Sequence, residues 1–106
     1  MDAQDHDARS VLFHEAALAR MAEHPGLLDR ARATFARWNA VDRRRDGSRA
    51  AWDALLAEGD LKAIAAAALA PTEEGAVLRQ SSPLPTLLPP AERWSLIRRF
   101  RGSRGA

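Results

Sequence analysis

The 106-residue chain contains no cysteine and no tyrosine. Without cysteine it can form neither a disulfide framework nor a thiolate nucleophile, and a zinc site with sulfur ligands is excluded. A chain of this length buries one modest core without such supports, so we expect a single domain over residues 1–106. The absence of cysteine also fits cytoplasmic proteins, and we expect that location here.

Long apolar runs are missing as well. The longest, Ala63–Ala70, is mostly alanine and is much shorter than the roughly 20 apolar residues that cross a bilayer. The start of the chain, MDAQDHDARS, is polar and acidic, the reverse of a secretory signal peptide. We therefore expect no association with a membrane.

Signals for β-strands are few, because β-branched residues are scarce and no segment shows the alternation of a strand. Alanine is instead the commonest residue, and fifteen arginines stand beside a single lysine, Lys62. Alanine and arginine both favour helix. The sequence therefore predicts an all-α fold, an irregular bundle of five or six short helices.

Proline, glycine and capping residues divide the chain at short intervals. They predict helices at about 7–23, 25–45, 48–58, 60–70, 72–80 and 90–101. The expected amino-terminal caps are Asp5 or Asp7, Ser48, Asp60 and Thr72, and Gly59 suits a left-handed residue after a helix end. The two ends, 1–7 and 102–106, are predicted to be flexible.

Charge is unevenly placed along the chain. Residues 1–47 carry eight basic and eight acidic side chains, and residues 48–92 carry three basic and six acidic ones. Residues 93–106 contain five arginines and no acid. The net charge of +2 is therefore concentrated in a basic tail, which can meet an anionic partner.

The sequence contains no metal-binding pattern and none of the common catalytic motifs apart from one loose match described below. There is no glycine-rich phosphate loop, no nucleophile elbow and no pair of carboxylates at catalytic spacing. The three histidines, His6, His14 and His24, do not have the spacing of metal ligands. We therefore expect a non-catalytic protein without metal or cofactor.

One loose match to a catalytic motif is present. Arg9 and His14 form the pattern R-x4-H, which is found in the RNA-cleaving site of HEPN domains. With fifteen arginines, about one such match is expected by chance. A partly buried histidine on the apolar face of a helix is the simpler interpretation, and a small HEPN-like RNase is the least favoured alternative.

The segment Leu78–Phe100 differs most from the rest of the chain. It contains four prolines, which stop a helix and force extended geometry before a new helix begins. In a structural interpretation its leucines close one end of the bundle, Gln80 or Ser82 satisfies loose backbone groups, and Arg79 pairs with Glu92. In a functional interpretation the same segment binds a partner protein. The two interpretations are compatible.

Tryptophan and arginine dominate the energetics of protein interfaces, and this segment is rich in both. The predicted partner-binding residues are Arg79, Gln80, Ser82, Leu84, Leu87, Arg93, Trp94, Arg98 and Arg99. A nucleic-acid-binding regulator is the main alternative. It would use Arg43, Arg44, Arg45 and Arg101 to hold phosphates, because the helix at 60–70 offers only Lys62 and could scarcely read base edges.

The stretch LRQSSPL (78–84), followed by Leu88 and by Glu92-Arg93-Trp94, resembles a signature near the end of a group of small, largely uncharacterised bacterial helical proteins. That group commonly shows Leu-Arg-Gln-x-Ser-Pro-Phe followed by Glu-Arg. The resemblance extends over about residues 12–100, and it departs at Leu84, where phenylalanine is usual, and at Pro89, where a serine or threonine cap is usual. It implies a bacterial antitoxin-like protein of a toxin–antitoxin system, which binds and neutralises a partner toxin.

Overall fold

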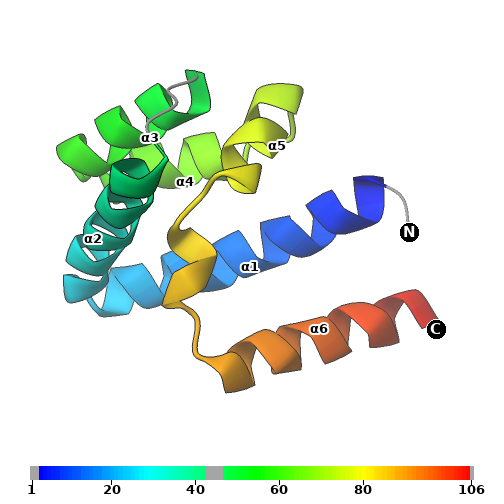
Figure 1. Ribbon diagram of the computed structural model, residues 1–106. Helices are drawn as coiled ribbons and strands as arrows, with labels where there is room; N and C mark the ends of the chain where they lie inside the picture. The colour runs from blue at the N-terminus through cyan, green and yellow to red at the C-terminus, as the bar shows by residue number, and fades with distance from the viewer. Residues whose placement is uncertain (1–2, 43–46, 106) are drawn as a thin grey trace.

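The computed structural model describes residues 3–42 and 47–105, with side chains from 7–42 and 47–101. This part of the chain contains six α-helices, one 3₁₀ turn and no strand, which confirms the predicted all-α fold (Figure 1). The elements are α1 (Ala3–Glu23), α2 (Gly26–Val41), α3 (Gly47–Glu58), α4 (Leu61–Ala68), α5 (Glu73–Gln80), η1 (Leu84–Leu87) and α6 (Pro90–Gly105). Among the described helices, none combines the length and apolarity needed to cross a bilayer.

Helix α1 lies at the centre of the bundle. It contacts α2, α4, α5, η1 and α6. Helix α6 packs mainly on α1, and a hydrogen bond from Arg93 also joins it to η1. Figure 1 shows α3, α4 and α5 on one side of α1, and α6 running antiparallel to α1 on the other side. The two faces of α1 are therefore covered by different parts of the chain.

The core is built mainly from aliphatic side chains around one buried tryptophan. Trp52, Ile64 and Leu84 are fully enclosed, and they come from α3, α4 and η1. The indole Nε1 of Trp52 donates a hydrogen bond of 2.9 Å to the carbonyl oxygen of Leu78, which ties α3 to α5. Burying the ring therefore leaves its polar group satisfied.

Several predicted helix ends are confirmed. The side chain of Asp60 accepts a hydrogen bond from the backbone N–H of Lys62, and that of Thr72 accepts one from Gly75. Gly59 has a φ of 71°, the left-handed conformation that glycine adopts without a Cβ clash. These caps depend on neighbours in sequence, which is why the sequence predicts them.

Two predicted caps are wrong. Because α1 already begins at Ala3, Asp7 lies inside the helix, and its carboxylate pairs with Arg79 instead. Helix α3 begins at Gly47, so Ser48 lies in its first turn, where its hydroxyl accepts a hydrogen bond from Ser81. Asp7 and Ser48 therefore make tertiary contacts and do not cap the helices. The prediction that residues 1–7 and 102–106 are flexible stays a prediction; of these residues only Asp7 has a described side chain, and Arg79 holds it.

Candidate partner-binding surface

Arg79 is an internal clamp. Its side chain is 2% exposed, and its Nε and Nη2 atoms each donate a hydrogen bond of 2.9 Å to the carboxylate of Asp7. Its Nη1 donates to the carbonyl oxygens of Ala68 and Ala70, at 2.9 and 3.0 Å. The guanidinium thus joins α5 to α1 and to the end of α4. The predicted partner contact of Arg79 is therefore wrong in this structure, because its donors face inward.

The predicted ion pair between Arg79 and Glu92 is also wrong. Glu92 instead accepts a hydrogen bond of 3.1 Å from Nη1 of Arg20, which links α6 to α1. Arg93, one residue further, donates from Nη2 to the carbonyl oxygen of Pro85 at 2.9 Å. The Glu-Arg pair of the signature therefore fastens the start of α6 to α1 and to η1.

The residues between α5 and α6 are also structural. The hydroxyl of Ser82 accepts a hydrogen bond of 3.0 Å from the backbone N–H of Leu84. Ser82, Leu84 and Leu87 are all buried, so a partner cannot reach them in this conformation. Their predicted role as contact residues is corrected to a role in forming the turn and closing the core.

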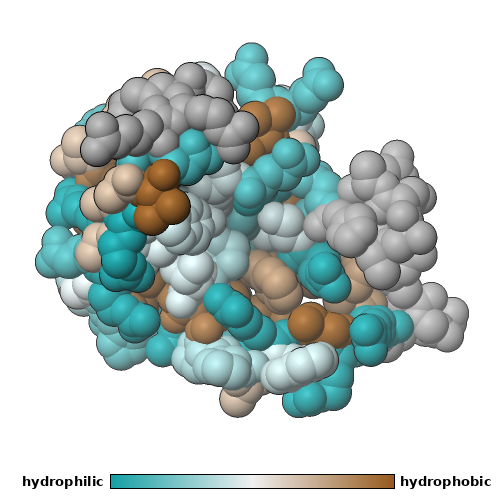
Figure 2. Space-filling model, viewed as in Figure 1, coloured by the Kyte–Doolittle hydropathy of each residue, from teal (hydrophilic) through white to brown (hydrophobic). Residues whose placement is uncertain are grey.

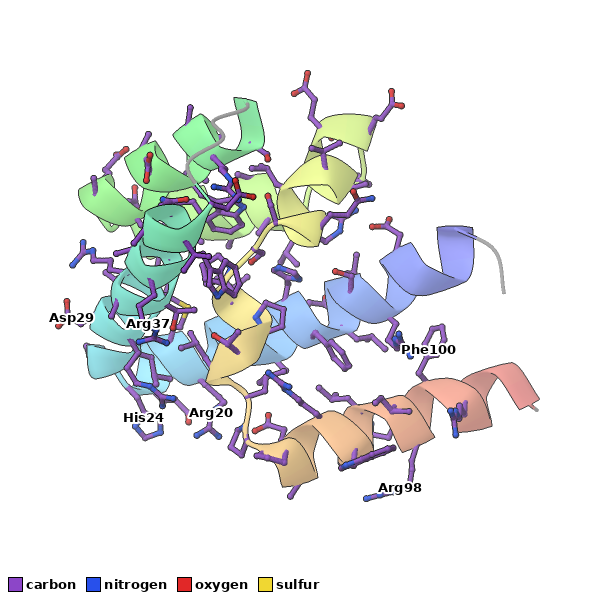
Figure 3. All side chains as sticks on the ribbon, viewed as in Figure 1. Arg20, His24, Asp29, Arg37, Arg98 and Phe100 are labelled. Atoms are coloured by element: carbon purple, nitrogen blue, oxygen red, sulfur yellow. The ribbon has the colours of Figure 1, made fainter. Side chains whose placement is uncertain are left out.

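Helix α6 turns one face to α1 and the opposite face outward. Leu96 is buried and Phe100 is half-buried. Figure 3 shows Phe100 pointing toward α1 and Arg98 pointing away from it. Trp94 is 58% exposed, the largest exposed fraction of the three tryptophans. The exposed ring therefore lies on the side of α6 that the bundle does not cover.

We call the outward residues Trp94, Arg98, Arg99 and Arg101 the α6 outer face. Trp94, Arg98 and Arg101 follow one another at helical spacing, so they share one side of α6, with Arg99 beside them. All three arginines are exposed, and none makes an ion pair or side-chain hydrogen bond with another described residue. The α6 outer face therefore combines an accessible aromatic ring with three positive charges that no described carboxylate neutralises.

The remaining predicted residues are distributed as follows. Gln80 is exposed at the carboxyl end of α5, and Arg101 of the nucleic-acid alternative belongs to the α6 outer face. Arg43, Arg44 and Arg45 lie outside the described residues. Of the predicted partner-binding residues, the structure brings Trp94, Arg98 and Arg99 together on one accessible surface.

His14 does not form an accessible catalytic pair. The imidazole is fully buried, its Nδ1 donates a hydrogen bond of 2.7 Å to the carbonyl oxygen of Ser10, and its Nε2 has no partner among the described residues. Burial lowers the pKa of His14 below its usual 6.5, so the ring is neutral at physiological pH. RNA cannot reach this ring in the folded protein. Within the described part of the chain, no group of three or more potential metal ligands occurs.

Described residues also line two surface grooves. One, of about 340 Å³, lies between α3 and α5 and is lined by Gly47, Ser48, Ala51, Glu73, Glu74, Val77 and Leu78. The other, of about 480 Å³, lies between α2 and α3. Figure 2 shows a mostly hydrophilic surface on which apolar side chains form small separate patches. Sequence reasoning missed both grooves, because each is made by helices that only the tertiary fold brings together.

A scan against protein-family models found no match, and comparisons with curated proteins and with solved structures found none either. The assignment of a function therefore depends on the residues and the geometry of this chain.

Proposed function

We propose that this protein is a non-catalytic interaction module that binds a partner protein through the α6 outer face. The observation that carries the proposal is the exposure of Trp94 beside exposed arginines that pair with no other described residue. A tryptophan left more than half exposed forgoes the free energy of burying a large ring. Binding recovers that free energy when the ring enters a pocket on another protein.

The chemistry of this face indicates what the partner must offer. Tryptophan and arginine are the two residue types that contribute most at the centres of interfaces. An apolar pocket bordered by carboxylates would accept the indole of Trp94 and pair with Arg98 and Arg101. The proposed partner is therefore a protein with an acidic surface around an apolar depression.

The partner that we propose is a cognate toxin in the cytoplasm of a bacterium, which this chain neutralises by covering its site. The resemblance of the segment 78–94 to small bacterial helical proteins supports this proposal. The clamp and turn residues of that segment support it indirectly, because they fix the orientation at which α6 leaves the core.

The test is co-expression with each protein encoded beside this gene, followed by affinity measurements on the complex. We expect the double variant Trp94→Ala/Arg98→Glu to bind at least about 30-fold more weakly, as loss of a hot-spot residue does. The matched control is Trp38→Ala/Arg30→Glu, which changes an exposed tryptophan and an exposed arginine on α2. It should bind within about threefold of the wild type.

Two results would overturn the proposal. If both double variants bind the partner equally well, the α6 outer face is not part of the interface. Absence of any bound neighbour, together with affinity for a short DNA duplex or RNA that falls steeply with added salt, would identify a nucleic-acid-binding protein instead. Circular dichroism of each variant checks that the helical fold is kept.

A further inference from the structure

The groove between α3 and α5 has an apolar floor and an acidic border. Ala51, Val77 and Leu78 supply the floor, and Val77 is 45% exposed, which makes it one of the few large apolar side chains at the surface. Among the described residues, the charged ones that line the groove are Glu73 and Glu74, and both are exposed. Neither glutamate pairs with another described residue, so both carboxylates remain available to a cation.

The chemistry of the groove is complementary to that of the α6 outer face. The groove offers an apolar depression bordered by two carboxylates, and α6 offers an exposed indole followed by exposed guanidinium groups. A volume of about 340 Å³ is large enough for one tryptophan side chain. The two surfaces belong to the same chain but lie on opposite sides of α1, so they cannot meet within one molecule (Figure 1).

We propose that the occupant of this groove is α6 of a second copy of the chain. With Trp94 of one copy on Val77 of the next, Arg98 lies one helical turn beyond the indole. Glu73 and Glu74 lie one turn before Val77 on α5. When the two helices run antiparallel, these turns overlap, and Arg98 faces the two carboxylates. Trp94 and Arg98 on α6 have the same spacing as Val77 and the two glutamates on α5. This match fixes the register and the antiparallel direction of the two helices.

This contact is head-to-tail. Each copy uses its α6 outer face on one neighbour and its groove on another, so the association leaves one groove and one α6 unused at the ends. A single helix on a shallow groove makes a small interface, and we expect weak affinity. The contact shares Trp94 and Arg98 with the proposed partner interface but does not depend on it. A tightly bound partner would displace the second copy.

The experiment mixes two variants that each keep one half of the contact. Val77→Arg places a cation in the groove floor and leaves α6 intact, whereas Trp94→Ala/Arg98→Glu disables α6 and leaves the groove intact. The wild type should form oligomers whose average mass grows with concentration in sedimentation velocity, and each variant alone should be monomeric. The mixture should form a 1:1 heterodimer and no larger species, because only one working contact remains.

Reversal of the charges tests the antiparallel register. Glu74→Arg and Arg98→Glu should each weaken self-association about tenfold or more, and the chain that carries both changes should regain it, because each ion pair is rebuilt with opposite signs.

A wild type that stays monomeric up to about 1 mM, where millimolar contacts become populated, overturns the proposal. So does a mixture without heterodimer, or a double variant without recovery. No partner protein is present in these measurements, so their failure leaves the proposed partner interface untouched, and failure of partner capture leaves self-association untouched.

Discussion

Arg79 shows how one buried charge organises the carboxyl half of the chain. In place of water, its guanidinium binds one carboxylate from α1 and two carbonyl oxygens from the end of α4. The carboxylate of Asp7 is its only anionic partner among the described residues. A buried cation without a counter-charge lowers the stability of the folded state. The carboxylate of Asp7 therefore stabilises the whole bundle.

We expect Asp7→Asn to lower the free energy of unfolding by about 1–3 kcal/mol, less than for a fully buried pair because Asp7 is 42% exposed. The matched control is Asp29→Asn, since Asp29 is 80% exposed and pairs with Arg32 within α2. The control should change the free energy of unfolding by less than about 0.5 kcal/mol. Urea unfolding measures both, and equal losses would contradict a clamp at Arg79.

His14 should make the stability of the protein depend on pH. Burial lowers its pKa in the folded state below 6.5, whereas the unfolded chain keeps the usual value. As the pH falls through 6.5 toward the folded pKa, the unfolded chain binds the proton first. The free energy of unfolding is therefore fully retained above 6.5 and decreases below it, by up to about 1.4 kcal/mol per pH unit.

Urea unfolding at several pH values between about 7.5 and 5 measures this slope. The variant His14→Gln should show a much smaller slope in that window. His24→Gln, which changes an exposed histidine, should keep the slope of the wild type. Identical slopes in the two variants would show that other groups cause the dependence.

At the scale of elements, α5 is held close to the end of α4 by a glycine. A Cβ atom at Gly75 would lie 2.2 Å from the carbonyl oxygen of Ala70, closer than any real contact, whereas one at Gly26 would meet nothing within 4 Å. We expect Gly75→Ala to lower the free energy of unfolding by about 1–3 kcal/mol through this overlap. Gly26→Ala should raise it by about 0.4–1 kcal/mol, because alanine restricts the unfolded chain. Thermal unfolding compares the two, and equal shifts in Tm would contradict the close approach.

Helix α6 is the least supported element. Its described contacts are with α1, including the ion pair of Glu92 with Arg20, and with η1 through the hydrogen bond from Arg93 to Pro85. We expect its amide hydrogens to exchange faster than those of α4, because few contacts oppose its local opening. Hydrogen exchange followed by mass spectrometry measures this difference. Equal protection of the two helices would show that α6 opens only when the whole protein unfolds.

The elements also show where sequence reasoning succeeds. The caps at Asp60 and Thr72 follow from hydrogen bonds across two or three residues, so local rules predict them. The partner of Arg79 lies 72 residues away, and no local rule selects Asp7 over Glu92. The exposed residues of α6 follow from helical spacing once the inward face is known. The groove joins two segments that are distant in sequence, so periodicity within either segment could not indicate it.

At the scale of the whole molecule, α1 collects contacts from nearly every later segment. During synthesis α1 leaves the ribosome before η1 and α6, which cover one side of it. At ordinary elongation rates its apolar side waits on the order of several seconds for η1 to follow. The growing chain therefore passes through a stage in which α1 is complete and uncovered. Until η1 and α6 follow, that apolar side of α1 is open to any chaperone at the ribosome that binds amphipathic helices.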